Sequence, residues 1–260
     1  MVFVMLVRTI ISYYAPYFQP EKAEMEHVLT IEAPSETTNA VQGAVFDGEY
    51  YYVAFIDRTT EYHTAIIVQT DAEGNEIKRS EVLPVDHANS ITILENGNLM
   101  VSHCYSPDGH TNRYSVLDKD TFEIVEVADL NETAMAIAYD GEKECFVTAE
   151  GIAKKMNVYT KDMELKESFE VDFLPETQPQ SYFCTDNKIY TVRFSYNEGV
   201  FLNYLYVYSY DAKTLLEYEM EMPDTCEAEA VSVVDKDIYI ICADSGKCEI
   251  YKMKNMIAWR

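Results

Sequence analysis

The segment Gln42–Phe55, QGAVFDGEYYYVAF, decides the fold of this chain. Apolar and aromatic residues lie on both sides of Asp47-Gly48, a dipeptide whose glycine readily adopts the positive φ of a tight turn. Aromatic and β-branched residues favour strands. The segment therefore predicts a β-hairpin.

Four more segments repeat this pattern farther along the chain. They are NSITILENGNLMVSH from Asn89, MAIAYDGEKECFVTA from Met135, QSYFCTDNKIYTVRF from Gln180 and EAVSVVDKDIYIICA from Glu229. Their turns are expected at Asn96-Gly97, Asp140-Gly141, Asp186-Asn187 and Asp235-Lys236, with positive φ supplied by the Asn-Gly and Asp-Gly pairs. The five segments begin 45 to 49 residues apart, which is the period of a β-propeller blade.

A third strand follows each hairpin, and a fourth strand follows the first four of them. The third strands are AIIVQTD, YSVLDKD, MNVYTKD, LYVYSYD and CEIYKM, and the fourth are EIKRSEVL, FEIVEVADL, ELKESFEV and LLEYEMEM. The segment EHVLTIEA, Glu26–Ala33, has the character and spacing of the missing fifth one. The sequence therefore predicts an all-β, five-bladed β-propeller with four-stranded blades, in which the N-terminal strand completes the last blade.

One domain accounts for the repeats. We expect residues 26–260 to form a single β-propeller, and residues 1–25 to be an N-terminal segment, either an atypical leader or a docking tail. No run is long enough to span a bilayer. The absence of a clear signal peptide favours the cytoplasm. The sequence does not settle the compartment.

The net charge of the chain limits the classes of molecule that it is expected to bind. The chain carries 45 Asp and Glu against 20 Lys and Arg, a net charge of −25. This charge repels nucleic acid and anionic lipid, and it favours cations, basic peptides or neutral ligands such as sugars. Alternatively, the charge only keeps the protein soluble.

Most of the six cysteines lie in apolar strand runs, which favours free, buried thiols and a reducing compartment. Cys242 and Cys248 flank a short turn, so a disulfide across that hairpin is the alternative.

Candidate site residues follow from the propeller geometry. Strands of a blade alternate in direction, so the first residues of the innermost strands share a face with the loops between the second and third strands. Long loops on one face of a rigid scaffold are where binding usually occurs. The predicted ligand-binding residues are Gln42, Tyr62, His87, Asn89, His103, Tyr105, Gln180, Arg193, Tyr196 and Glu229.

Two interpretations of the near-axial polar residues remain open. They either hydrogen-bond neighbouring blades around a water-filled channel or form the floor of a ligand or ion site. His87, Glu229 and Glu227 are the catalytic candidates by position, and an Arg193–Glu229 ion pair would explain both of those residues structurally. No metal-ligand spacing occurs, and a calcium ion near the acidic axis is the one cofactor left open.

The blade entries carry a resemblance. V-Q-G-A-V-F-D-G, D-H-A-N-S-I, A-M-A-I-A-Y-D-G, P-Q-S-Y-F-C and E-A-E-A-V-S-V together resemble a group of bacterial five-bladed propellers. Members of that group are mostly uncharacterised and often extracytoplasmic, so the resemblance implies a location outside the cytoplasm and little about activity.

Two weaker likenesses concern enzymes. Plant-type glutaminyl cyclases are also five-bladed, and Glu229 matches their axial glutamate, although Gln42, Asn89 and Gln180 replace acidic positions. Five-bladed glycosidases need two or three axial carboxylates, for which Glu229, Glu227 and Asp86 are the available residues.

Taken together, these patterns favour a non-enzymatic propeller that binds a small molecule, sugar or peptide, or a protein. The site is expected on the face formed by the inter-blade loops and the loops between second and third strands. An enzyme of the glutaminyl-cyclase or glycoside-hydrolase type is the alternative. We expect a monomer.

Overall fold

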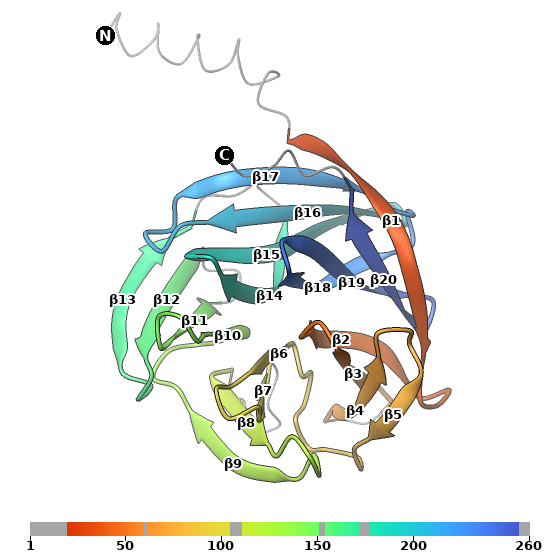
Figure 1. Cartoon of the computed structure of the whole chain (residues 1–260), viewed down its shortest axis with the longest axis horizontal. Helices are drawn as coiled ribbons and strands as arrows, with labels where there is room; N and C mark the ends of the chain where they lie inside the picture. Colours follow the sequence, from red (N-terminus) through yellow and green to blue (C-terminus); the bar gives the residue numbers. More distant parts are fainter. Residues whose placement is uncertain (1–19, 60–61, 105–110, 151–153, 172–176, 255–260) are drawn as a thin grey trace, which may run out of the picture.

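The computed structural model describes residues 20–59, 62–104, 111–150, 154–171 and 177–254. These residues contain twenty strands in four hydrogen-bonded sheets and no helix. Figure 1 shows the strands arranged in groups around a common centre. The architecture is all-β and propeller-like.

Three of the sheets contain four antiparallel strands each, in the order of the sequence. The first sheet has β2 (Thr38–Phe46), β3 (Tyr50–Asp57), β4 (Thr64–Asp71) and β5 (Glu76–Arg79). The second has β6 (Ser90–Ile93), β7 (Leu99–Ser102), β8 (Arg113–Leu117) and β9 (Ile124–Asp129). The third has β10 (Ala136–Asp140), β11 (Cys145–Glu150), β12 (Lys155–Thr160) and β13 (Leu165–Glu170).

The fourth sheet is larger because one strand bridges two groups. Its members are β14 (Gln178–Thr185), β15 (Lys188–Asn197), β16 (Val200–Tyr208), β17 (Thr214–Glu221), β18 (Glu227–Val234), β19 (Asp237–Asp244), β20 (Lys247–Met253) and β1 (Glu21–Glu32). Residues Glu21 to Glu24 of β1 pair in parallel with β17, and Met25 to Glu32 pair antiparallel with β20. The strand starts before the expected Glu26 because its first residues find a partner in β17.

The hairpin turns follow the predicted dipeptides with one exception. Gly48 and Gly97 have φ of 102° and 84°, while Asp186-Asn187 and Asp235-Lys236 have positive φ at both residues. A turn does follow Asp140, but the predicted positive φ at Gly141 is wrong, since Glu144 (φ 48°) is in the positive-φ region and Gly141 is not. Asp140 pairs with Cys145, and its Oδ1 accepts the backbone N–H groups of Glu142 and Lys143. That side chain organises a longer loop, which removes the need for a glycine turn.

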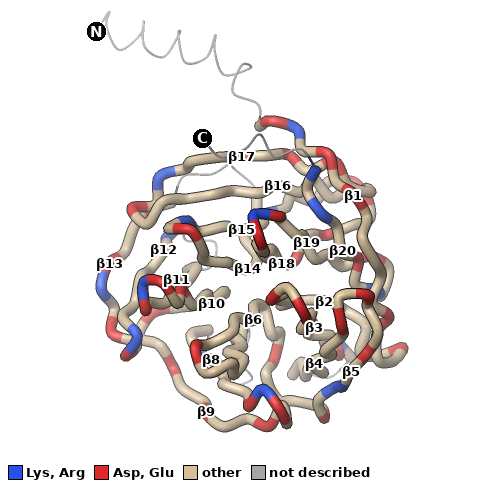
Figure 2. The backbone as a smooth tube through the Cα atoms, viewed as in Figure 1, with Lys and Arg blue, Asp and Glu red and all other residues tan. Residues whose placement is uncertain are grey.

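The core lies between neighbouring sheets. Between the first and second sheets, for example, Val45, Ala54 and Ile67 belong to one buried cluster with Val101 and Leu117. The outermost strands are mostly exposed, as in β9. Figure 2 shows Asp, Glu, Lys and Arg mainly around the periphery, with the strands nearest the centre mostly uncharged.

Gly43 permits a close approach between the first two sheets. Its backbone N–H donates to the carbonyl oxygen of Ala88 at 2.8 Å. A Cβ at this position would lie 2.4 Å from that oxygen and 2.8 Å from the backbone of Ser90. The bare backbone therefore brings Gln42 and Asn89 to the same central region.

The described cysteines are all free thiols, and Cys104, Cys145, Cys226, Cys242 and Cys248 are buried. Ala243, and not Cys242, pairs with Cys248 across the β19–β20 hairpin. The alternative of a Cys242–Cys248 disulfide is therefore wrong for this structure. Over the same described residues, there is no helix with the length and apolar character needed to cross a membrane.

Candidate functional site

A cavity of about 430 Å³, here called the central cavity, lies where the inner strands begin. The inner strands are β2, β6, β10, β14 and β18, which lie nearest the centre in Figure 1. The lining residues come from the starts of inner strands, the links before them, the β3–β4 loop, the chain after β7 and strand β15. They are Gln42, Arg58, His63, His87, Asn89, Cys104, Met135, Gln178, Pro179, Gln180, Phe194 and Glu227.

Several predicted site residues meet in this cavity. Gln42, His87, Asn89, Gln180 and Glu227 all line it. Glu229 lies behind Gln42 with 1% of its surface exposed. The strand-entry positions therefore converge on one site.

Two amide–carboxyl contacts attach strand β18 to its neighbours on either side. Gln180 Nε2 donates to Glu227 Oε1 at 3.2 Å, which joins β14 to β18. Gln42 Nε2 donates to Glu229 Oε1 at 3.1 Å, which joins β2 to β18. These contacts hold both carboxyl groups in fixed positions.

Burial sets the protonation of the two carboxyl groups. Desolvation raises the pKa of Glu227, and the charge of Arg58 and the Gln180 contact oppose the rise. For Glu229, desolvation raises the pKa well above its ordinary value, the charge of Glu227 adds to the rise, and Arg58 opposes it. Two carboxyl groups that interact in this way resist double ionisation.

Two histidines lie together beside these carboxyl groups. The Nδ1 atoms of His63 and His87 are 3.1 Å apart, so one ring donates its proton and the other accepts it. Burial lowers the pKa of His87 to about 4, and the charges of Arg58 and His63 add to the effect. His87 is therefore uncharged at neutral pH.

His103 and Arg193 lie outside the central cavity lining. His103 Nε2 lies 2.9 Å from Ser115 Oγ within the second sheet. Arg193 donates from Nε to Thr177 Oγ1 at 2.9 Å and from Nη2 to the Thr177 carbonyl at 2.8 Å. The predicted Arg193–Glu229 pair is therefore wrong, because Arg193 turns toward the chain before β14. The cation that acts on Glu227 and Glu229 is Arg58.

Two of the three predicted aromatic residues are exposed side chains that are not among the lining residues of the central cavity. Tyr62 and Tyr196 are 50% and 61% exposed, and Tyr105 lies outside the described residues. The ring of Tyr196 lies 4.7 Å from that of Phe201, whose centroid is 5.7 Å from that of Phe194. Because Phe194 lines the cavity, these rings form a row that leads from solvent into the site.

Sequence reasoning missed Arg58, His63 and Phe194 as site residues. Arg58 and His63 occupy the loop between β3 and β4, and this loop position was the available signal. The inward direction of Phe194 depends on the register of β15, in which it pairs with Gln178 and Asn203. No pattern in the sequence specifies that direction.

Two polar atoms of the lining have no hydrogen-bond partner among the described residues. They are Gln42 Oε1, an acceptor, and Asn89 Nδ2, a donor. Their residues are 2% and 3% exposed. A buried polar group without a partner is costly, and such groups in folded proteins usually bind water or a ligand.

The sequence left open a calcium ion near the axis, and the arrangement of acidic, histidine and cysteine side chains does not support it. No group of three or more such side chains within the described ranges is placed to hold a metal ion. A calcium ion near the axis stays a prediction.

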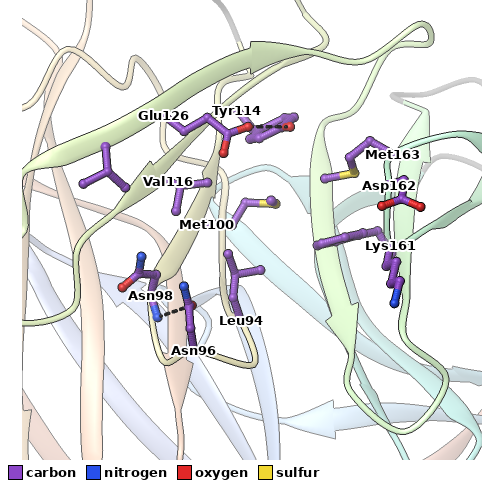
Figure 3. A pocket seen from close by; sticks show the side chains of 12 residues that line it. Leu94, Asn96, Asn98, Met100, Tyr114, Val116, Glu126, Lys161, Asp162 and Met163 are labelled. Carbon is purple, nitrogen blue, oxygen red and sulfur yellow. Dashed lines mark hydrogen bonds between the residues drawn. The ribbon is translucent and has the colours of Figure 1, made fainter.

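Two other cavities differ from the central one in chemistry. One of about 440 Å³ lies between the second and third sheets, where Figure 3 shows Leu94 and Met100 on one side and Lys161 and Met163 on the other. No predicted site residue lines it, and none of the buried unpartnered polar atoms of the described residues belongs to its lining. The other, about 280 Å³, lies at the far ends of the inner strands among mainly apolar residues such as Phe46, Ile93 and Phe183.

The sheets and their central cavity define a β-propeller-like protein of the all-β class. No protein-family model matches the sequence, and neither does any curated protein sequence.

Solved structures do match the fold. A luciferin-regenerating enzyme matches with a TM-score of 0.51 and 8% identity, over 90% of this chain and 96% of that one. A DUF4221 family member from Bacteroides vulgatus matches with a TM-score of 0.48 and 10% identity, over 92% of this chain and 100% of that one. Hydrazine synthase from Kuenenia stuttgartiensis matches with a TM-score of 0.46 and 11% identity, over 80% of this chain and 56% of that one.

At these identities the likeness concerns the fold alone. The match to the luciferin-regenerating enzyme, with a TM-score of 0.51, agrees with the propeller-like architecture. The likeness to plant-type glutaminyl cyclases finds no support in these matches.

Proposed function

We propose that the chain is a five-bladed β-propeller, completed by β1, that binds a small polar molecule in the central cavity. The observation that carries the proposal is the pair of unpartnered atoms, Gln42 Oε1 and Asn89 Nδ2, on two lining residues. A ligand with a donor and an acceptor group satisfies both atoms and recovers the cost of their burial. The cavity volume of about 430 Å³ falls in the usual range for small-molecule sites.

Fixed polar groups around the cavity support selective binding. Gln42, Gln180 and Glu227 are held by contacts between strands, so little side-chain freedom is lost when a ligand binds. The neutral His87 adds a further hydrogen-bonding group, and Arg58 adds the positive charge.

The first test is thermal unfolding of the full chain with single probes: glucose, galactose, glycerol, L-leucine, L-glutamine and glycyl-glycine. A probe at about one hundred times its dissociation constant stabilises a protein by roughly 2.7 kcal/mol. Calorimetry then gives the affinity of any probe that raises the melting temperature.

Asn89→Leu provides the matching variant, because it removes the unpartnered donor while keeping similar volume. Asn157→Leu is the control, since Asn157 Nδ2 is also buried without a partner but belongs to β12, away from the cavity. We expect Asn89→Leu to weaken binding by about tenfold or more, the equivalent of ~1.4 kcal/mol, and Asn157→Leu to leave it unchanged. A panel in which no probe stabilises the chain contradicts the proposal.

A glycoside hydrolase is the second candidate, favoured by the interacting carboxyl groups of Glu227 and Glu229. One protonated and one ionised carboxyl group are the requirement for glycoside hydrolysis. Release of nitrophenol from nitrophenyl glycosides tests this candidate. Activity that is lost in both Glu227→Gln and Glu229→Gln supports it, and activity that survives both changes rules it out.

A further inference from the structure

We propose that the ligand of the central cavity is a free α-amino acid with an apolar side chain, bound as its zwitterion. This inference rests on the proposed function, and it goes further by assigning each part of the ligand to residues of the lining.

The donors in the cavity match a carboxylate. Arg58 lines the cavity, and among the described residues it has no hydrogen bond or ion pair. A guanidinium group offers a planar set of donors that fits a carboxylate. Asn89 Nδ2 supplies a further buried donor without a partner. A carboxylate that meets both groups gains charge-assisted hydrogen bonds.

The acceptors in the cavity match an ammonium group. Glu227 lines the cavity, and Gln180 occupies one position on its Oε1. A carboxylate has about four acceptor positions, so capacity for a further donor remains. Gln42 Oε1 is the other acceptor, and it is unpartnered. An ammonium group has three donors and no acceptor, which suits these two oxygens.

An apolar part of the same lining fits the side chain of the amino acid. Met135, Pro179 and Phe194 face the cavity together with the polar groups. The ring row from Phe194 through Phe201 to Tyr196 extends this apolar surface to an exposed aromatic side chain. A side chain of the size of leucine, methionine or phenylalanine can pack there.

Charge balance favours a zwitterion over an ion of one sign. A simple anion would meet Glu227, and the net charge of −25 would repel it from the whole molecule. A simple cation would meet Arg58 and leave Asn89 Nδ2 unsatisfied. A zwitterion pairs each of its charges with an opposite charge in the lining.

Calorimetry with the full chain tests the assignment. The probes are L-leucine, L-methionine and L-phenylalanine, with two analogues of leucine: 3-methylbutylamine, which lacks the carboxylate, and 4-methylpentanoate, which lacks the ammonium group. At least one amino acid is expected to bind. Each leucine analogue is expected to bind about tenfold or more weakly than leucine.

Two variants separate the ends of the ligand. Arg58→Gln is expected to weaken leucine binding by about tenfold and to strengthen the binding of 3-methylbutylamine, because its ammonium group no longer meets a like charge. Glu227→Gln is expected to weaken leucine binding similarly and to strengthen the binding of 4-methylpentanoate, because its carboxylate no longer meets a like charge. Lys161→Gln is the control, because Lys161 lines the cavity between the second and third sheets.

The outcomes distinguish this inference from the proposed function. Suppose that glucose binds, that Asn89→Leu weakens this binding, and that no amino acid binds. The proposed function then stands and the amino-acid assignment is overturned. The assignment is also overturned if the affinity for leucine is unchanged in both Arg58→Gln and Glu227→Gln. If none of the probes in either panel binds, both proposals fail.

Discussion

Single residues of the central site combine burial with charge. Glu229 is fully buried behind Gln42, and its carboxyl group lies in the field of Glu227. A group in this position contributes to the pH dependence of folding, because its proton affinity differs between the folded and unfolded chain.

We expect Glu229→Gln to change the response of stability to pH. The folded-state pKa of Glu229 lies above the ordinary value of 4.5, so in the window between these two values the folded chain binds more protons than the unfolded chain. The contribution of this group to stability is complete below pH 4.5 and is lost as the pH rises through the folded-state pKa. Glutamine keeps the acceptor for Gln42 and does not titrate. The variant should therefore gain stability relative to the parent as the pH rises above 4.5 and through the folded-state pKa of Glu229.

Denaturant unfolding at several pH values measures this difference, with exposed Glu81→Gln as the control. Parallel pH profiles for Glu229→Gln and the parent would contradict the prediction.

Gly43→Ala is expected to destabilise the chain. The added Cβ would lie 2.4 Å from the Ala88 carbonyl oxygen, and backbone atoms cannot move aside as a flexible side chain can. Overpacking of this kind costs roughly 1–3 kcal/mol. Gly141→Ala is the control, because its Cβ would meet only Tyr139, at 3.6 Å, and its φ is not in the positive region. Equal unfolding midpoints for the two variants in urea would refute the close-approach argument.

Among the elements, β1 depends most clearly on long-range partners. It pairs with β17 through its first four residues and with β20 through the rest. Ile31 is buried in the cluster shared by the first sheet and β18–β20, whereas Val28 is exposed.

Ile31→Ala should cost about 2–5 kcal/mol, the usual range for a buried large-to-small change. Val28→Ala should stay within about 0.5 kcal/mol, as surface changes usually do. Urea denaturation of both variants checks the difference. Similar small losses in the two variants would mean that β1 is not packed as described.

The sequence predicted hairpins where turn dipeptides and strand patterns agree, as at Asp47-Gly48. It gave the wrong turn conformation after Asp140, where a side chain caps the loop. It also missed the start of β1, where pairing with β17 extends a strand over residues with no strand pattern. The site was predicted in part because strand entries recur at equivalent positions, which brought Gln42, Asn89 and Gln180 together. Arg58 was missed and the pairing of Arg193 with Glu229 was wrong, since loop path and side-chain direction are decided by tertiary contacts.

At the scale of the whole molecule, the excess of acidic residues is the dominant electrostatic feature. The net charge is −25, and the charged residues lie mainly around the periphery in Figure 2. Surface ion pairs such as Lys247–Glu32 oppose the repulsion, but exposed pairs contribute only about 0–1 kcal/mol each.

We therefore expect the melting temperature to rise when NaCl increases from 10 mM to 500 mM, because salt screens the repulsion between acidic side chains. Scanning calorimetry at a fixed pH measures the shift, and sucrose at equal osmolality controls for exclusion of solute from the surface. A fall in melting temperature would mean that attractive pairs outweigh the repulsion.

The two-sided pairing of β1 also has a consequence for biosynthesis. His27 of β1 contacts Glu249 of β20 across 222 residues of chain. The ribosome makes the N-terminal residues first, so β1 must wait without this partner until β20 has emerged. During that interval its backbone edge is open to pairing with other nascent chains. Folding of this protein in the cell should therefore depend on chaperones that cover an early strand until translation is complete.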